Sequence, residues 1–311
     1  MTKNAQELIN LASAQLNHVI LGKSTQVKLA LTALLGGGHL LLEDLPGMGK
    51  TTLAHGLSNV FGLDYKRVQF TSDLLPADVI GAPVFDAKSS EFSFRPGPIF
   101  SDIFLADELN RATPRAQSAL LEAMEERQVS VDGETHHLPD PFFVIATQNP
   151  QSQSGTFPLP ESQLDRFLLR ISLGYPDQAA ERELLKGKHG RSSLDAMQCC
   201  ISRDQLRVIQ AQVPRIKMTD ALLDYVQRLV AKTREQDLVL LGLSPRGSLA
   251  LVRSAQSWAL IQGRDHVLPE DVQAVFAAVA GHRMVGRRET QGTQLARHIL
   301  NEVDVVGGVS V

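Results

Sequence analysis

The 311-residue sequence is short of three things: cysteine, excess positive charge and long apolar runs. Its two cysteines, Cys199 and Cys200, are adjacent, and adjacent cysteines rarely form a disulfide because the closed ring is strained. No metal-binding spacing surrounds them, so neither a disulfide scaffold nor a cysteine-ligated metal is expected. Reduced, structural cysteines are typical of a cytoplasmic protein, and we expect that location.

The charge balance and the uncharged stretches argue against two further classes of protein. A formal net charge of −3 argues against a general binder of nucleic acids or membrane surfaces, although it leaves room for a local basic patch. Residues 29–42 form an uncharged stretch that is shorter than the ~20 residues of a membrane helix, and it includes three glycines. Residues 1–20 are polar with a helical pattern, so we do not interpret them as a signal peptide. We expect no membrane insertion.

The first half of the chain alternates short apolar runs with helical patterns. Five runs have the character of buried strands: residues 39–43, 65–71, 103–107, 142–148 and 167–173. Strands that alternate with helices predict a parallel sheet with helices on both faces. Ligands bind such a sheet at the carboxyl ends of its strands, and Asp44, Asp107 and Asn149 all follow such ends.

Two segments interrupt this alternation and indicate β-hairpins. Residues 81–100 favour an extended insert whose polar tip falls at residues 86–91. Residues 127–138 contain Asp132-Gly133 between two short alternating runs, which is a strong hairpin signal.

The pattern changes near Pro176, after which the chain has the periodicity of amphipathic helices. Thr219 precedes one such helix as its cap, and Ser244 precedes another, followed by a proline at the first helical position. We therefore expect a larger α/β domain over residues 1–176 and a smaller all-α domain over residues 177–311.

The stretch "LLLEDLPGMGKTTLA", residues 40–54, matches most of the phosphate-loop pattern G-x-x-x-x-G-K-[ST], but Asp44 stands where the first glycine is expected. Backbone N–H groups of the loop would surround phosphates at the positive end of the following helix. Lys50 would reach the β- and γ-phosphates, and the Thr51 hydroxyl would bind Mg²⁺. The predicted nucleotide-binding residues are Pro46, Gly47, Met48, Gly49, Lys50, Thr51 and Thr52. The alternative is a strand-to-helix turn that merely needs glycines.

A pair of acids strengthens the nucleotide interpretation. The apolar run "IFLAD" ends in Asp107, and Glu108 follows it. Asp107 is placed to hold Mg²⁺ through water, and Glu108 is placed to orient or deprotonate an attacking water. A strand that ends in two acids could also begin an exposed loop, but that alternative is weak beside a Gly-Lys-Thr loop. We therefore expect nucleotide hydrolysis.

Three further polar residues are candidates for catalysis. Asn149 follows a buried strand, where its amide could hold the lytic water or the γ-phosphate, although it could simply start a turn before Pro150. Arg166 is a candidate arginine finger, which contributes a factor of ~10³–10⁵ in rate, or else part of a surface ion pair. Arg246 lies at a helix N-terminus, where a cation is unfavourable to the dipole unless an anion faces it.

Taken together, these residues resemble the AAA+ ATPases, and most closely the MoxR family. The resemblance extends over nearly the whole chain and is most specific in "FTSDLLPADVIGAPVF" and "RPGPIFSDIFLADELNRATPRAQSALLEAMEERQVSVDG". It implies an α/β fold: an AAA+ P-loop parallel-sheet core with helices on both faces, followed by a smaller all-α lid domain. Members often carry an acid at the first loop position, so Asp44 is compatible with activity if its side chain caps a nearby N–H and points away from the phosphates.

The resemblance also implies roles for the candidates. These are Walker A for residues 44–51, Walker B for Asp107 and Glu108, sensor 1 for Asn149, a trans-acting arginine finger for Arg166, and sensor 2 for Arg246. It leaves open whether Arg246 acts in its own subunit or across an interface. Three segments gain roles as well: the helix-2 insert near residues 81–98, the pre-sensor-1 hairpin near 127–141, and residues 21–23 near the adenine.

The family resemblance implies a chaperone-like ATPase that uses ATP and Mg²⁺ to remodel or activate protein partners. It implies a homo-oligomeric ring, expected to be a hexamer, with sites shared between subunits. A partner with a von Willebrand factor A domain is implied too, and we expect it on another chain.

Two alternatives from other classes stay open. One is a nucleotide-switched scaffold with little turnover, against which the intact Glu108, Asn149 and Arg166 argue. The other is a nucleic-acid motor, which would need basic hairpin tips, whereas "DAKSSE" and "SVDGETHH" are rich in acids. Nucleic acid is therefore not an expected partner. Adjacent His136 and His137 could suggest a metal, but on an extended strand they point to opposite faces, so solvated positions are favoured.

Overall fold

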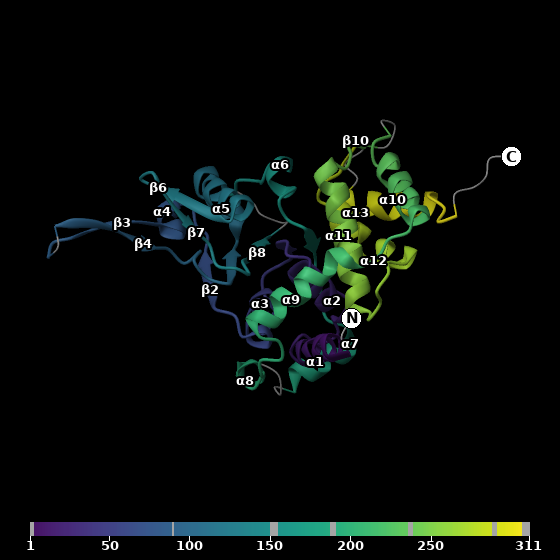
Figure 1. The fold of residues 1–311 in the computed structure, drawn as a ribbon, viewed down its shortest axis with the longest axis horizontal. Helices are drawn as coiled ribbons and strands as arrows, with labels where there is room; N and C mark the ends of the chain where they lie inside the picture. The colour runs from purple at the N-terminus through teal and green to yellow at the C-terminus, as the bar shows by residue number, and fades with distance from the viewer. Residues whose placement is uncertain are drawn as a thin grey trace.

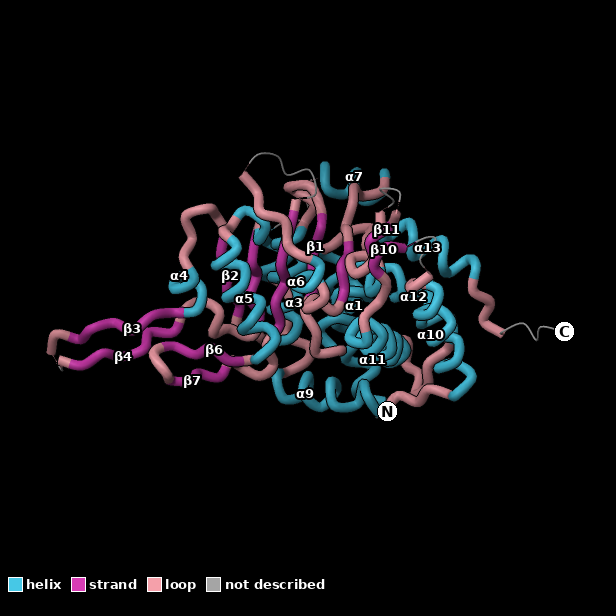
Figure 2. The backbone as a smooth tube through the Cα atoms, turned by 90° about the horizontal axis from the view of Figure 1, so that it is seen from above, coloured by secondary structure: helices cyan, strands magenta, loops and turns pink. Residues whose placement is uncertain are grey.

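The structure is a computed structural model, and it describes residues 3–88, 90–149, 155–186, 191–235, 239–287 and 291–306. An α/β body carries a group of helices beside it, and a long β-ribbon projects from the other side of the body (Figure 1). Figure 2 shows the same order from above, with the ribbon at one end and helices α10 to α13 at the other.

The centre of the body is a five-stranded parallel sheet in the order β2-β5-β8-β1-β9. Its strands are β1 (Leu40–Glu43), β2 (Tyr65–Gln69), β5 (Ile103–Asp107), β8 (Phe143–Gln148) and β9 (Leu169–Ile171). All five predicted strands are confirmed. The inner strand β5 is buried throughout and is apolar except for its final acid, because helices cover both faces of the sheet.

Alternate side chains of β5 enter different apolar clusters, as the period of two in a strand requires. Leu105 belongs to the cluster of α3 (Lys50–Phe61), and Phe104 belongs to that of α5 (Pro114–Glu126). The other elements of the two layers are α1 (Lys3–Val19), α2 (Ser24–Leu35), α4 (Pro76–Ile80) and the short turn η1 (Leu109–Arg111). Because all five strands are parallel, their carboxyl ends lie at one edge of the sheet.

The two predicted hairpins are confirmed as antiparallel ribbons. The first pairs β3 (Gly81–Asp86) with β4 (Glu91–Pro96), and the second pairs β6 (Gln128–Val131) with β7 (Glu134–His137). The second turns through Asp132 and Gly133, both in the left-handed region with φ of 52° and 84°, as an Asp-Gly hairpin requires. Phe94 stacks on His136 with ring centroids 3.9 Å apart, so the two ribbons contact each other.

The second part of the chain is helical, as predicted. Its elements are α7 (Gln178–Leu185), α8 (Arg191–Asp195), α9 (Arg203–Gln212), η2 (Val213–Arg215), α10 (Asp220–Lys232), α11 (Pro245–Ile261), α12 (Pro269–Ala280) and α13 (Gly292–Glu302). Thr219 and Ser244 cap α10 and α11 through their side chains, as the sequence predicts. The sequence did not predict a short antiparallel ribbon of β10 (Val239–Leu241) and β11 (Val285–Gly286), because so few residues carry no periodic signal.

The helices after Pro176 do not all stand apart from the body. Asn59 of α3 donates a hydrogen bond to the Leu194 carbonyl at 2.9 Å, and Cys200 donates through its backbone N–H to the Val60 carbonyl at 2.8 Å. One apolar cluster runs through both parts. The domain boundary at Pro176 stays a prediction. Within the described residues, each helix is too short or too polar to cross a membrane.

Candidate nucleotide site

The loop between β1 and α3 has the backbone of an anion site. Gly47 and Gly49 have φ of 84° and 89°, which side chains rarely adopt, and a Cβ added at either would meet nothing within 4 Å. The loop therefore opens onto free space at the start of α3, and no side chain caps that helix. Exposed N–H groups at the positive end of a helix are suited to bind phosphate.

Asp44 lies in this loop but points away from the phosphate side. Its buried carboxylate accepts hydrogen bonds from the Ser172 hydroxyl at 2.7 Å and from the backbone N–H groups of Leu173 and Gly174 at 2.5 and 3.0 Å. It ties the loop to the segment that follows β9. This supports the interpretation that an acid here is compatible with an active site.

Residues 21–23 contact the same segment from another side. Lys23 Nζ donates to the Tyr175 carbonyl at 2.5 Å. Gly22 has φ of 68°, and a Cβ there would lie 3.1 Å from the carboxylate of Asp177. Their predicted place beside the adenine stays a prediction.

A cavity of about 360 Å³ lies beside the loop. It is lined by Pro46, Gly47, Gly49, Lys50, Thr51, Thr52, Arg67, Gln69, Asp107 and Glu108. Six of the seven predicted nucleotide-binding residues and both Walker B acids are thus brought together. The exception is Met48, whose side chain packs against the apolar cluster of the body.

Lys50 is a buried cation in the lining of this cavity. Its Nζ donates to the Asp44 carbonyl oxygen at 2.7 Å, and the residue is only 9% exposed. Burial lowers the pKa of the Lys50 ammonium, and the carboxylates of Asp44, Asp107 and Glu108 oppose that shift. The surrounding acids therefore favour a charged lysine, which is the form that binds phosphate.

Asp107 is held from two sides. Thr147 Oγ1 donates to its Oδ1 at 2.6 Å, while Arg67 donates to its Oδ2 from Nε at 3.1 Å and from Nη2 at 2.6 Å. The backbone N–H of Glu108 donates to the same Thr147 hydroxyl at 2.8 Å. One hydroxyl thus aligns both acids.

The residues fit a nucleotide with Mg²⁺. Oxygen ligands are what Mg²⁺ prefers, and Thr51 and Asp107 both line the cavity. Asp107 already attracts a cation, because its Oδ2 binds the Arg67 guanidinium. The open loop at Gly47 and Gly49 provides the space for phosphates.

The two remaining candidates near this edge differ in their surroundings. Glu108 has φ of 55°, and its Oε2 accepts from Arg111 Nη1 at 2.8 Å. Asn149 is half-buried just after β8, at the same edge of the sheet as Asp107. The turn at Pro150 lies outside the described residues.

Arg166 and Arg246 form a separate cluster. Both contact Glu125 of α5: Arg166 Nη2 lies 3.1 Å from Oε2, and Arg246 Nη2 donates to Oε1. Neither arginine is among the described residues that line the cavity beside Lys50. The structure therefore brings the two arginines to each other, and the anion that faces Arg246 within this chain is Glu125.

Sequence reasoning missed Arg67, Thr147 and Glu125. Thr147 had a weak signal, as a polar residue near the end of an apolar strand, whereas Arg67 had none, because β2 also carries Lys66 and Gln69. Glu125 had none, because nothing local distinguishes it from the other acids of α5.

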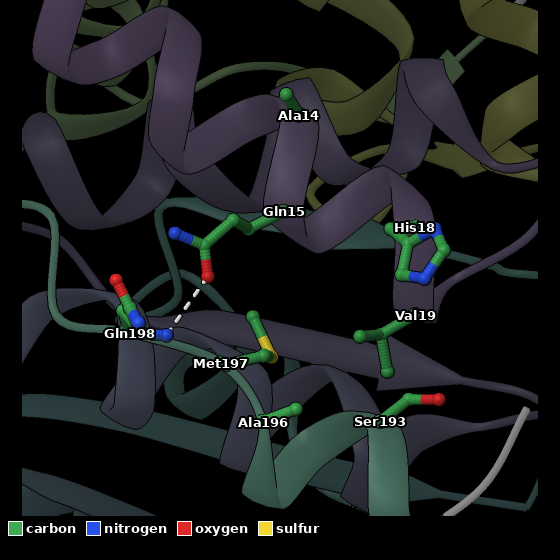
Figure 3. Close-up of a pocket in the computed structure, with 8 residues that line it drawn as sticks. All are labelled: Ala14, Gln15, His18, Val19, Ser193, Ala196, Met197 and Gln198. Atoms are coloured by element: carbon green, nitrogen blue, oxygen red, sulfur yellow. Dashed lines mark hydrogen bonds between the residues drawn. The ribbon is translucent and has the colours of Figure 1, made fainter.

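A larger cavity of about 500 Å³ lies between α1 and α8 (Figure 3). Its lining includes Ala14, His18 and Met197, and the Gln198 N–H donates to Gln15 Oε1 at 3.0 Å. Among the described residues, its lining has no glycine loop and no pair of acids. Chemistry therefore favours the smaller cavity as the functional site.

Comparison with known proteins supports this choice. Residues 39–169 match the ATPase family associated with various cellular activities (AAA), and residues 231–303 match the AAA lid domain. Chaperone MoxR1 of Mycobacterium tuberculosis is 41% identical over 280 residues, which are 87% of this chain and 74% of that protein. Protein MoxR of Paracoccus denitrificans is 34% identical, over 88% of this chain and 87% of its own. The chain belongs to the MoxR family of AAA+ ATPases.

The MoxR-family likeness extends beyond these two relatives. Uncharacterized protein YeaC of Bacillus subtilis is 45% identical over 303 residues, which are 96% of this chain and 95% of that protein. A crystal structure from Cytophaga hutchinsonii, described as that of a proposed ATPase, superposes with a TM-score of 0.88 at 34% identity and covers 96% of this chain and 95% of its own. The predicted AAA+ core and lid are thus confirmed, while the roles of single residues stay predictions.

Proposed function

We propose that this MoxR-family protein hydrolyses ATP in a ring, expected to be a hexamer, and uses the energy to remodel or activate protein partners. One observation supports shared sites: the arginine cluster on Glu125 lies apart from the cavity lined by Lys50, Asp107 and Glu108. A site whose arginines lie elsewhere on the same chain can be completed by a neighbouring copy. The chaperone role is supported by the printed name of the Mycobacterium tuberculosis relative.

Within each site the residues have distinct tasks. Backbone N–H groups from Gly47 to Thr51 bind the phosphates, and Lys50 neutralises the β- and γ-phosphate charge. Glu108 orients and deprotonates the attacking water, and Asn149 positions that water or the γ-phosphate.

Thr51 and Asp107 would hold Mg²⁺, which supplies positive charge to the phosphate oxygens when it is bound. Arg166 and Arg246 of a neighbour stabilise the charge that develops in the transition state. This assigns Arg246 to the adjacent subunit, which the sequence left open.

The exposed ribbon is the surface that we assign to protein partners, which include a protein with a von Willebrand factor A domain. Phe85 and Phe92 near its tip are 53% and 72% exposed, with ring centroids 5.2 Å apart. The tip carries Asp86, Lys88 and Glu91, a balance that does not favour nucleic acid. A cytoplasmic location belongs to the proposal as well, since Cys199 and Cys200 are free thiols.

A nucleotide-switched scaffold is the second candidate, and one observation favours it. Both Walker B acids already contact arginines, Asp107 with Arg67 and Glu108 with Arg111. An acid held in this way must be released before it acts. Slow turnover would follow if that release were the limiting step.

The test is ATP hydrolysis per subunit as protein concentration is varied, for the wild type, Glu108→Gln and Arg166→Ala. We expect a specific rate that rises with concentration and collapses in both variants. A rate that is flat with concentration and indifferent to Arg166 would overturn shared sites. ATP binding without hydrolysis in the wild type would favour the scaffold.

A further inference from the structure

Three elements meet at the carboxylate of Glu125, which lies near the end of α5. Arg166 comes from the segment before β9, and Arg246 comes from the first turn of α11 in the lid. One carboxylate oxygen contacts each arginine, Oε2 for Arg166 and Oε1 for Arg246. The side chains are only partly exposed, at 32% for Glu125, 27% for Arg166 and 47% for Arg246.

A second acid, Asp165, holds the backbone segments that carry Arg166 and Arg246. Asp165, the residue before Arg166, accepts from Arg283 Nε at 2.6 Å and from the Ser244 hydroxyl at 3.1 Å. Ser244 is also the cap of α11, because its hydroxyl accepts from the Gly247 N–H at 3.0 Å. Core and lid are therefore joined immediately beside the two arginines.

Arg283 reinforces this junction. Its side chain is 3% exposed and donates to the carbonyl oxygens of Leu168 and Asp165 at 3.2 and 3.1 Å. A buried cation with this many partners holds its neighbours in one arrangement, since loss of the Asp165 carboxylate would leave the Arg283 charge buried without an ion-pair partner. Asp165 and Arg283 thus hold the backbone near Arg166 and Arg246. Glu125 orients the side chains of these two arginines.

Each guanidinium contacts Glu125 through a single nitrogen and keeps further N–H donors. A guanidinium carries five N–H donors, and each arginine uses one nitrogen on Glu125. Arg166 Nε is buried without a hydrogen-bond partner among the described residues. Two guanidinium groups this close also repel each other unless an anion lies between them.

We propose that Glu125 is a positioning residue, which holds Arg166 and Arg246 as one pair that binds a single anionic group. That group is the terminal phosphate of a nucleotide held by a second copy of this chain. The inference rests on the proposed shared sites and adds to them a residue that would touch neither the nucleotide nor the attacking water. Because the pair acts on charge that develops in the transition state, Glu125 affects kcat more than KM.

The test is steady-state hydrolysis with varied ATP, at a protein concentration where the rate per subunit has stopped rising. Glu125→Gln removes the charge and leaves one acceptor for two cations. We expect kcat to fall about 10-fold, with KM for ATP changed less than about twofold, since a misplaced catalytic group loses part of its effect. Glu126→Gln is the matched control, because Glu126 is an exposed neighbour on α5 with no ion pair among the described residues. It should keep the wild-type kcat.

Two further variants separate positioning from a structural role. In a background that carries both Arg166→Ala and Arg246→Ala, Glu125→Gln should cause little additional loss, because both arginines through which it acts are already gone. Glu125→Asp keeps the charge and should recover part of the lost kcat. A full additional loss in this triple variant, or a loss explained by weaker assembly in sedimentation, would overturn the inference.

The outcomes for the two proposals differ. If Arg166→Ala lowers the rate and Glu125→Gln does not, shared sites stand and the role of Glu125 is overturned. If the wild-type rate is flat with concentration and Arg166→Ala has no effect, both are overturned. Urea unfolding of each variant checks that the fold is intact.

Discussion

Arg67 binds the Oδ2 oxygen of Asp107 through two nitrogens, Nε and Nη2. The contact crosses from the edge strand β2 to β5, and Arg67 is 47% exposed at its side chain. A partly exposed guanidinium can leave this position without a large cost. Arg67 would therefore compete with Mg²⁺ for Asp107 if Asp107 holds the ion as we propose.

Replacing Arg67 tests this competition. Arg67→Ala should lower the Mg²⁺ concentration for half-maximal binding of a fluorescent ATP analogue by about fivefold, because an exposed ion pair contributes up to about 1 kcal/mol. Arg67→Lys is the control, since it keeps a charge without the two-nitrogen contact. Its Mg²⁺ requirement should lie between those of the wild type and Arg67→Ala. An unchanged or raised Mg²⁺ requirement in Arg67→Ala would show that the arginine assists the metal site.

Asp44 should matter for stability more than for nucleotide binding. Asp44→Gly removes the acceptor of three hydrogen bonds from Ser172, Leu173 and Gly174, and should lower the free energy of unfolding by about 1–3 kcal/mol. ATP hydrolysis should persist, because the carboxylate points away from the loop that binds phosphate. Urea unfolding and ATP titration measure the two effects separately. Loss of ATP binding in a folded Asp44→Gly variant would contradict this division.

Lys50 and Glu108 should fail at different steps. Lys50→Ala removes the buried cation of the phosphate site, so it should abolish detectable ATP binding. Glu108→Gln keeps the shape of the site and removes only the base, so it should bind ATP normally while hydrolysis falls by about 10²–10⁴-fold. Equilibrium binding beside single-turnover hydrolysis separates the two. Equal binding loss in both variants would place Glu108 in nucleotide binding.

The buried ring of His39 should make stability depend on pH. Its Nδ1 accepts from the Val144 N–H at 3.0 Å, and burial lowers the pKa of His39 from 6.5 to about 4. Between these values the unfolded chain binds a proton that the folded chain does not, so stability falls as pH falls. The loss from this residue is about 2 kcal/mol between pH 7 and pH 5.

His39→Gln is the variant that isolates this contribution. The difference in the free energy of unfolding between wild type and variant should shrink by about 2 kcal/mol on going from pH 7 to pH 5. The comparison with wild type removes the contribution of His282, whose pKa burial also lowers. His137→Gln is the control at an exposed position, and its free energy of unfolding should change with pH as that of the wild type does. A constant difference across this pH range would refute a neutral buried His39.

The sequence by itself determined the elements and the nucleotide loop of this protein. The five strands, the Asp-Gly hairpin and the caps at Thr219 and Ser244 were all predictable, because each depends on residues a few positions apart. The positive φ of Gly47 and Gly49 was predictable for the same reason. Periodicity and backbone sterics act locally, so local patterns reveal them.

Only the tertiary structure decided which side chains meet. Asp44 turns toward Leu173, Arg67 reaches Asp107, and Glu125 joins Arg166 with Arg246, each across elements far apart in the chain. Such contacts depend on strand order, on the register between neighbouring strands and on the angle at which the lid packs. The sequence therefore shows which residues carry a charge that requires a partner when it is buried, but the packing of distant elements determines which residue becomes that partner.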